Sequence, residues 1–384
     1  MQMSLFCPRL FDGLSMHHDV LLETGGGLVQ GIVGAGAAGE ALSLPPDCTV
    51  APGLVDIQVN GGGGVLFNDT PTARGLARLA HAHAMQGTTA LLPTLISDTR
   101  SRVAQAVEAV RLAHGSVPGV LGIHLEGPFL RPERRGIHSL DRIASFDGAS
   151  DLALLSALGG AGKTLVTLAP ECVPQGTVRA LRALGVLVFA GHTDASFEQT
   201  QNAVAEGLDG FTHMFNAMSQ FSARAPGSVG AALLAPGCYA GLVLDGHHVA
   251  TGSVAVLRAA RGLERVVLVS DAMPPAGTAD TAFMLQGVPI QVEAGRCVGP
   301  GGTLAGAAIT LADAVRIATL QYGFALESAL ACAARVPAQL LGLADEYGVL
   351  RVGARADAVV FDGALRVCGV MQGGQWIRPL EVLP

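Results

Sequence analysis

Three residues that lie far apart in the chain could together bind a metal ion. Glu126, His192 and His213 each end an apolar stretch of strand length. One carboxylate and two imidazoles form a common ligand set for catalytic zinc-type sites, and three protein ligands leave one coordination position free for water. A cation in such a site lowers the pKa of that water from about 16 towards about 7. The set therefore predicts metal-assisted hydrolysis.

A further carboxylate, Asp271, ends the last of these apolar stretches, directly before Ala-Met-Pro-Pro. A carboxylate beside a metal site can take a proton from water and then give it to a leaving amine. The alternative role is a helix cap for the next segment, which Pro274 and Pro275 disfavour. We therefore predict that Asp271 acts as general base and general acid.

These residues need a scaffold that brings several strand ends together. Eight apolar stretches alternate with Ala- and Leu-rich helical stretches, and this alternation predicts a parallel sheet. The stretches are 55–60, 89–96, 120–126, 165–171, 186–192, 211–216, 239–245 and 266–271. Eight units in roughly 290 residues match a (β/α)8 TIM barrel, although the pattern alone is also compatible with a doubly wound sheet. The fold class is therefore α/β.

The polar residues at the ends of these stretches favour the barrel. In a barrel, the carboxyl ends of all strands face one mouth, where enzymes of this fold place their chemistry. Nearly every stretch ends in a group that can bind metal, proton or substrate. These groups are Gln58, Asn60, Glu126, Glu171, His192, His213, Asn216, Asp245, His248 and Asp271.

Both ends of the chain differ from this central pattern. Residues 1–51 and 346–384 contain short apolar runs separated by glycine-rich turns, and neither end could form a core alone. We expect the two ends to pair into one small β-sandwich domain beside a barrel that spans 52–345.

Composition excludes several classes of protein. Half of the 384 residues are apolar, only 14% are charged, and the net charge is −7 without a basic stripe, so nucleic-acid binding is not expected. The seven cysteines form no Cys-x-x-Cys pair, which indicates free thiols in a reducing compartment. The uncharged stretch 225–244 is interrupted by Pro226 and Pro236, which argues against a membrane helix. Since the N-terminus has no signal-peptide pattern, we expect a cytoplasmic protein without membrane contact.

Several ordered segments carry a resemblance to a known family. They are Pro52-Gly-Leu-Val-Asp-Ile-Gln-Val-Asn-Gly, His124-Leu-Glu-Gly-Pro-Phe, Leu168-Ala-Pro-Glu, Gly191-His-Thr-Asp-Ala, Thr212-His-Met-Phe-Asn-Ala-Met, Asp245-Gly-His-His-Val, Ser270-Asp-Ala-Met-Pro-Pro-Ala-Gly and Gly302-Thr-Leu-Ala-Gly. From about residue 50 onward, the chain resembles the N-acetylglucosamine-6-phosphate deacetylases of the amidohydrolase superfamily. The resemblance implies hydrolysis of the acetamide of N-acetylglucosamine 6-phosphate to glucosamine 6-phosphate and acetate.

The resemblance also implies roles for individual residues. Glu126, His192 and His213 match the metal ligands, Asp271 matches the general base and acid, and His138 matches the histidine that polarises the acetyl carbonyl. The substrate contacts would come from Ile137, His138, Asn216, Ala217, Arg224, His248, Leu304, Ala305 and Gly306. Arg224 and His248 are the natural phosphate partners. Because a second subunit often completes the phosphate pocket in this family, the resemblance also implies a homodimer.

Two departures from wider superfamily patterns bear on the metal. Many amidohydrolases carry His-x-His at the end of the first strand, where this chain has Gln58-Val-Asn60. Gln58 and Asn60 are candidates for a second or near-metal site, but they are poor zinc ligands, so we expect one divalent metal per subunit. The only lysine, Lys163, starts its strand and therefore lies at the wrong end to bridge metals. Zinc is the first choice, and iron, cobalt or manganese would also suit these ligands.

Other interpretations stay open at this point. The same chemistry could act on N-acetylgalactosamine 6-phosphate, or on another cyclic or N-acyl amide. A catalytically silent scaffold is a further alternative, although this chain keeps the metal and base residues. The glycines at 34–39 spell a dinucleotide fingerprint, but Pro45-Pro46 follow too soon for the required helix. His81 and His83 spell a metal motif on a predicted helix, where residues two apart do not share a face.

Overall fold

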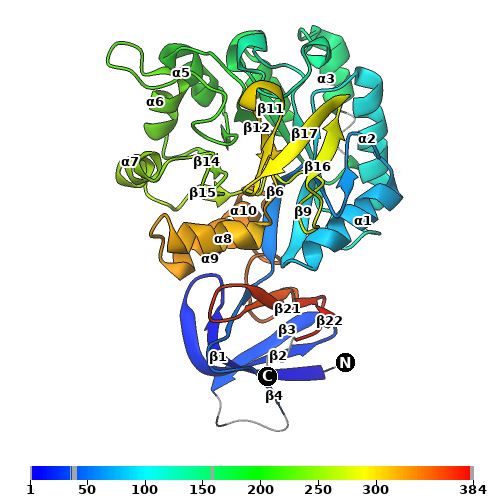
Figure 1. Ribbon diagram of the computed structural model, residues 1–384, viewed down its shortest axis with the longest axis vertical. Coiled ribbons are helices and arrows are strands. Elements are labelled where there is room, and N and C mark those ends of the chain that lie inside the picture. Colours follow the sequence, from blue (N-terminus) through cyan, green and yellow to red (C-terminus); the bar gives the residue numbers. More distant parts are fainter. Residues whose placement is uncertain (1, 35, 37–40, 157–159, 381–384) are drawn as a thin grey trace.

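A parallel eight-stranded barrel forms the centre of the molecule (Figure 1). The computed structural model of the chain describes residues 2–34, 36, 41–156 and 160–380. Neighbours in the barrel follow chain order: β6 (Leu54–Val59), β9 (Thr88–Ile96), β10 (Gly122–Glu126), β11 (Lys163–Leu168), β12 (Leu187–Ala190), β13 (Gly210–Phe211), β14 (Tyr239–Leu242) and β15 (Val266–Leu268). The predicted α/β barrel is confirmed.

Helices surround this barrel, and their apolar faces pack on it in one continuous core. They are α1 (Ala73–Ala84), α2 (Arg100–Ala113), α3 (Gly148–Ser156), α4 (Thr177–Ala183), α5 (Phe197–Ala205), α6 (Gly227–Leu233), α7 (Thr251–Arg261), α8 (Leu311–Leu320), α9 (Leu326–Ala333) and α10 (Arg335–Leu340). Short 3-10 helices lie at η2 (Pro132–Arg134), η3 (Leu140–Arg142), η5 (Pro170–Cys172) and η6 (Pro300–Gly302). Among the described residues, no helix is both long enough and apolar enough to cross a membrane.

The first and last barrel strands, β6 and β15, do not pair in a regular β-ladder. Isolated contacts join them instead. Near the mouth, Val59 bridges Ala272, and the Asn60 amide donates to the Ala272 carbonyl at 2.9 Å. Deeper in the barrel, the buried Asp56 carboxylate accepts a hydrogen bond from the Ser270 amide at 3.2 Å. A carboxylate therefore substitutes for part of the missing backbone pairing.

Both ends of the chain form a second sheet below the barrel (Figure 1). Its order is β22-β21-β20-β5-β1-β2-β3, with β4 added beside β1. The strands are β1 (Gln2–Phe11), β2 (Met16–Gly25), β3 (Leu28–Gly34), β4 (Leu42–Ser43), β5 (Thr49–Pro52), β20 (Ala358–Phe361), β21 (Val367–Gln372) and β22 (Gln375–Arg378). Leu5 and Val50 share a buried cluster with Val360 and Met371. The prediction of one small β domain built from both ends is confirmed.

Most of the glycine motif at 34–39 lies outside the described residues. The structure therefore has no bearing on the shape of that segment. A dinucleotide fingerprint requires a long helix directly after the glycines. The described residues that follow the motif contain strands of the small domain instead, at 42–43 and 49–52.

An antiparallel meander follows the last barrel strand and was not predicted from the sequence. It consists of β16 (Ala282–Leu285), β17 (Val288–Glu293), β18 (Arg296–Val298) and β19 (Leu304–Ala307). Met273 and Ile96 pack in its apolar cluster. The Ala307 amide donates to the Asp271 carbonyl at 3.0 Å, which fixes the meander to the end of β15. A small hairpin of β7 (Gly61–Gly62) and β8 (Val65–Leu66) follows β6.

Candidate active site

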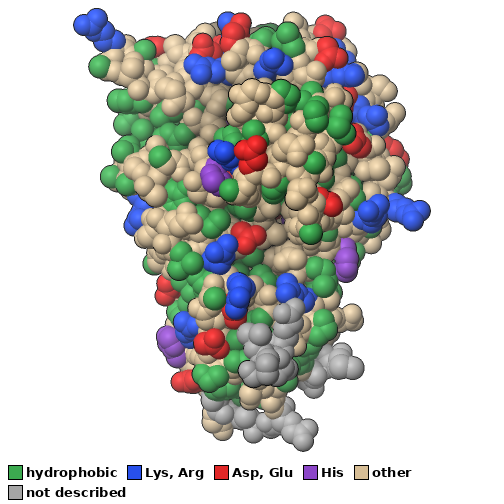
Figure 2. Space-filling view, in the orientation of Figure 1, with side chains coloured by type: hydrophobic (Ala, Val, Ile, Leu, Met, Phe, Trp, Pro, Cys, Tyr) green, Lys and Arg blue, Asp and Glu red, His purple; other side chains and the backbone are tan. Residues whose placement is uncertain are grey.

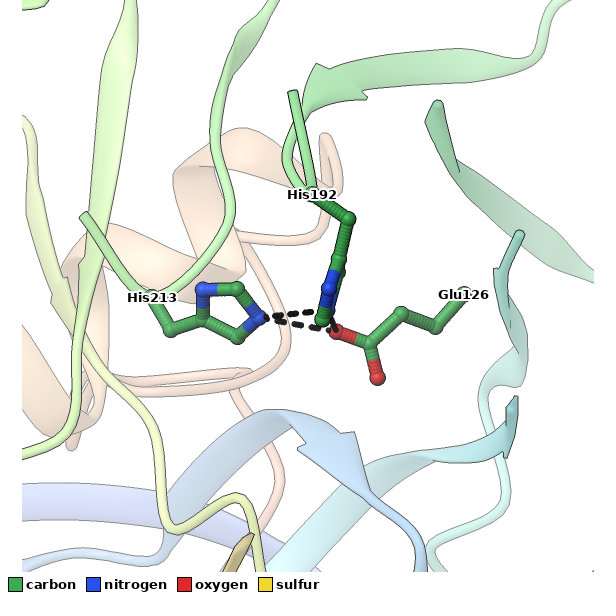
Figure 3. A group of neighbouring side chains, drawn as sticks. All are labelled: Glu126, His192 and His213. Carbon is green, nitrogen blue, oxygen red and sulfur yellow. Dashed lines mark hydrogen bonds and ion pairs between the residues drawn. The ribbon is translucent and has the colours of Figure 1, made fainter. Parts of the chain in front are cut away.

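The three predicted metal ligands converge at the mouth of the barrel (Figure 3). One ligand atom from each of Glu126, His192 and His213 lies within 4.8 Å of the other two. The Glu126 Oε1 atom is 3.2 Å from His192 Nε2 and 3.1 Å from His213 Nε2. All three side chains are buried. Residues separated by up to 87 positions therefore form one compact cluster.

The donor atoms of this cluster suit a divalent cation. The two imidazole Nε2 atoms are only 3.0 Å apart and both face the same carboxylate oxygen. His192 Nδ1 lies 2.9 Å from the Arg134 carbonyl, a contact that requires a proton on Nδ1 and leaves the Nε2 lone pair free. Burial raises the pKa of Glu126, but the two imidazoles beside it outweigh this effect and hold that pKa well below its usual range. An ionised carboxylate and neutral imidazole nitrogens are the states that bind metal.

The backbone turns sharply at three of the site residues. His192, His213 and Asp271 have φ angles of 48°, 32° and 48°, which lie in the left-handed region that non-glycine residues seldom adopt. Each turn comes soon after its barrel strand ends. Such strained positions cluster at functional sites when the surroundings hold them.

Asp271 lies beside the cluster and is held by two amides. Asn60 Nδ2 donates to Asp271 Oδ1 at 2.6 Å, and Gln58 Nε2 donates to the same oxygen at 3.2 Å. Burial and the neighbouring Glu126 charge raise the pKa of Asp271 to about 6. The amides fix one oxygen of this carboxylate and leave the other for proton transfer.

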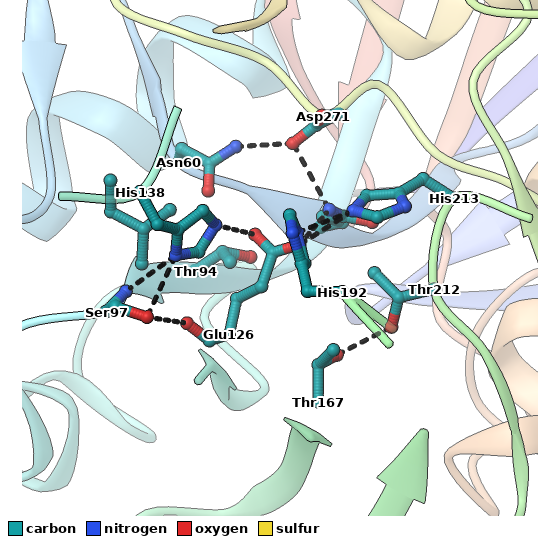
Figure 4. Close-up of polar contacts among 12 residues, drawn as sticks. Asn60, Thr94, Ser97, Glu126, His138, Thr167, His192, Thr212, His213 and Asp271 are labelled. Carbon is teal, nitrogen blue, oxygen red and sulfur yellow. Dashed lines mark hydrogen bonds and ion pairs between the residues drawn. The ribbon is translucent and has the colours of Figure 1, made fainter. Parts of the chain in front are cut away.

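His138 lies on the other side of Glu126 (Figure 4). Its Nδ1 accepts a hydrogen bond from the Ser97 amide at 3.3 Å, and its Nε2 is 4.0 Å from Glu126 Oε2. Since a backbone N–H can only donate, Nδ1 is the unprotonated nitrogen and Nε2 carries the proton. Burial lowers the pKa of His138 to about 3, so the ring is neutral. A neutral Nε2–H directed into the site can donate to a carbonyl oxygen.

A cavity of about 330 Å³ contains these groups. Most of the residues predicted to bind metal or substrate line it: Asn60, Glu126, Ile137, His138, His192, His213, Asn216, Ala217, His248, Asp271, Leu304 and Gly306. Ala305 is buried and is not part of the lining, and Arg224 is exposed in the loop before α6. Gln58 lies behind the lining and reaches Asp271 from there.

Known proteins are similar to this chain over most of its length. Residues 49–377 match the model of the Amidohydrolase family. The chain belongs to the amidohydrolase family. This amidohydrolase is 37% identical over 334 residues to the N-acetylgalactosamine-6-phosphate deacetylase of Shewanella sp. (strain ANA-3), covering 87% of this chain and 84% of the relative. It is 35% identical over 346 residues to the N-acetylglucosamine-6-phosphate deacetylase of Bos taurus, with the same coverage.

A solved structure agrees with the fold of this amidohydrolase. The N-acetylglucosamine-6-phosphate deacetylase of Pasteurella multocida superposes with a TM-score of 0.93 at 28% identity, covering 98% of this chain and 99% of that one. The resemblance predicted from the sequence motifs is therefore confirmed at the level of family and fold.

Several residues that support the site of this amidohydrolase were not foreseen. Ile96, Glu133, Arg134, Gly136, Met273 and Thr303 also line the cavity. Ser97 sets the tautomer of His138, and its position one residue after β9 is the signal that could have indicated it. Glu171 was expected at the mouth, but it accepts from Thr193 Oγ1 and the Asp194 amide, at 2.5 and 2.6 Å. It therefore holds the loop that follows His192.

Two further buried histidines, His124 and His83, have structural contacts. His124 is buried inside the barrel, with Nδ1 3.0 Å from the Ile57 carbonyl and Nε2 2.8 Å from Thr167 Oγ1. Together with Thr167 and Thr212 it forms a group of polar side chains inside the barrel, near the cluster of Glu126, His192 and His213. His83 is also buried, with Nε2 2.8 Å from the Gly61 carbonyl, so His81-x-His83 does not form a metal site.

Acidic and basic side chains are interspersed over the face shown in Figure 2, without a basic stripe.

Proposed function

We propose that this amidohydrolase hydrolyses the acetamide of N-acetylglucosamine 6-phosphate to glucosamine 6-phosphate and acetate. The observation that carries the proposal is the position of Asp271, held by Asn60 and Gln58 beside the cluster of Glu126, His192 and His213. The deacetylase names of the relatives support the substrate class.

Glu126, His192 and His213 would hold one divalent cation, with zinc as the first choice and iron, cobalt or manganese as alternatives. Such a cation supplies Lewis acidity, which lets water attack a carbonyl carbon near neutral pH. Gln58 and Asn60 use their amides on Asp271 instead of offering metal-binding imidazoles, which supports a single cation.

The protein residues divide the proton transfers between them. His138 Nε2–H donates to the acetyl oxygen and stabilises the negative charge that develops there. Asp271 takes a proton from the attacking water. It then gives the proton to the nitrogen as the C–N bond breaks, so acetate and an amine leave.

The phosphate end of the substrate would lie near His248. Its Nδ1 is 2.7 Å from Asp245 Oδ2, so its Nε2 is free to face the cavity that it lines. Arg224 is proposed as the second phosphate partner and would come from a neighbouring subunit, since it is exposed and outside this chain's own cavity. A homodimer is part of the proposal. Free thiols at all seven cysteines support a cytoplasmic location.

The galacto epimer, N-acetylgalactosamine 6-phosphate, is the second candidate substrate. The relative from Shewanella, which is 37% identical to this chain, is named for its action on that epimer. Acetate release from both N-acetylhexosamine 6-phosphates, with metal analysis of the same preparation, tests the proposal. We expect about one metal per chain and a preference for the gluco epimer. Turnover of neither sugar phosphate would refute the proposal, and a reversed preference would select the second candidate.

A further inference from the structure

Asn60 uses only half of its side-chain amide within the protein. Its Nδ2 donates to Asp271 Oδ1 at 2.6 Å, whereas its Oδ1 is buried and has no hydrogen-bond donor among the described residues. The residue is 0% exposed and lines the active-site cavity. Buried carbonyl oxygens without a donor are rare in folded proteins, so we expect a hydrogen-bond donor of a bound ligand to contact this atom.

The direction of this oxygen is fixed by the surroundings. The Asn60 backbone amide donates to the Ala272 carbonyl, and the Asn60 carbonyl accepts from the Phe67 amide, both at 2.9 Å. A turn of the side-chain amide by 180° would place Oδ1 against the Asp271 carboxylate, where two acceptors repel each other. The oxygen therefore points away from Asp271, towards the side of the site occupied by His138 and Glu126 (Figure 4).

An acetamide carries one acceptor and one donor, its carbonyl oxygen and its N–H. His138 Nε2–H matches the acceptor. The nitrogen must lie close to Asp271, which protonates it, and Asn60 Oδ1 is two bonds from the nitrogen that contacts Asp271. The orphan oxygen is thus placed to accept a hydrogen bond from the scissile N–H.

We propose that Asn60 is a specificity-determining catalytic residue whose Oδ1 binds the scissile N–H, so that the site selects acetamides over acetate esters. The inference rests on the proposed deacetylase function and adds the basis of its amide selectivity. As water oxygen bonds to the acetyl carbon and the C–N bond breaks, the nitrogen gains the proton from Asp271. The amine that forms keeps a hydrogen for Asn60.

Gln58 provides a matched control. It donates to the same Asp271 oxygen and to Glu126 Oε1, both at 3.2 Å, but it does not line the cavity. Replacement of Gln58 weakens the hold on Asp271 without removing a contact to the substrate nitrogen. Its effect is therefore expected to be the same for amide and ester substrates.

The test compares kcat/KM for N-acetylglucosamine 6-phosphate and for its ester analogue, 2-O-acetylglucose 6-phosphate, in wild type, Asn60→Leu and Gln58→Met. We expect Asn60→Leu to lose about 10- to 100-fold more on the amide than on the ester, the factor for a buried N–H left without its acceptor. Gln58→Met should lower both rates by the same factor. Metal content and melting temperature identify variants that are misfolded. If Asn60→Leu is misfolded, Asn60→Ala is used in its place.

The outcomes separate this inference from the proposed function. Equal losses on both substrates in an Asn60 variant of an active enzyme would overturn the role of Asn60 and leave the deacetylase function intact. A wild type inactive on the amide would overturn both. A wild type that cleaves the amide but not the more reactive ester would support the inference, because the ester offers Asn60 no donor.

Discussion

At the scale of single residues, the groups on either side of Glu126, Asp271 and His138, suit the two opposite roles proposed for them. Burial and the Glu126 charge raise the pKa of Asp271 to about 6, so it is mostly ionised at pH 7 and can accept a proton. Burial lowers the pKa of His138 to about 3, so it stays neutral and donates from Nε2. Environments that separate proton affinities in this way support the base and the hydrogen-bond donor proposed here.

Replacement of the base should stop turnover without loss of metal. Asp271→Asn keeps the size of the side chain but removes its ability to take a proton. We expect kcat to fall by about 10²- to 10⁴-fold, the usual contribution of a general base. Steady-state kinetics and elemental analysis of the purified variant check this. A variant with near wild-type kcat would remove Asp271 from the mechanism.

The rate should also depend on pH through Asp271. Only the ionised carboxylate accepts a proton, so kcat/KM should fall as pH drops below the pKa of the free enzyme's base. We expect the acid limb at or below about pH 6, because a bound cation can only lower the pKa of the neighbouring carboxyl. Rate profiles from pH 4.5 to 8 test this, and a limb well above pH 6 would contradict it.

At the scale of elements, the seam between β6 and β15 depends on a buried acid. Asp56 accepts hydrogen bonds from the Ser270 and Gln58 amides, at 3.2 and 3.1 Å. Burial raises the pKa of Asp56 to about 7. The folded protein therefore holds this proton more tightly than the unfolded chain, where an aspartate titrates near pH 4.

This seam should weaken as pH rises. The stability from protonated Asp56 is fully present below about pH 4 and is lost as pH rises to about 7, a change of the order of 2–4 kcal/mol. Asp56→Asn keeps an acceptor oxygen and cannot ionise, so it should lose less stability over this range. Thermal melts of both proteins from pH 5 to 8 compare the slopes. Parallel curves would show that Asp56 does not titrate there.

Much of the barrel and its site could be predicted because parallel strands must end at one mouth. That rule alone brings Glu126, His192, His213 and Asp271 together. It fails for Glu171, whose side chain turns to the loop after β12. The meander was missed because its strands are short, and the apolar pattern of β16 and β17 is weak because both contain exposed residues. The exposed position of Arg224, outside the lining of the cavity, depends on tertiary structure that the local sequence does not encode.

At the scale of the whole molecule, each of the two active sites of the proposed dimer would contain residues from both chains. Arg224 and Asp271 would then serve the same cavity from different subunits. Arg224→Ala and Asp271→Asn should each be nearly inactive alone. Mixed and reassembled subunits should recover up to about a quarter of wild-type activity, since one of the two sites in each hybrid is intact. Assays across mixing ratios measure this. No recovery despite confirmed hybrids would place Arg224 in its own subunit's site.

The small domain has a consequence for how the chain is made on the ribosome. Strand β5 pairs with β20, which is translated roughly 300 residues later, about 15 to 60 s at ordinary elongation rates. Until then, the edge of β5 that awaits β20 has no partner, while the barrel between them can already form. The nascent N-terminal strands are thus open to chaperones, or to wrong pairing with another chain, until the last strands emerge.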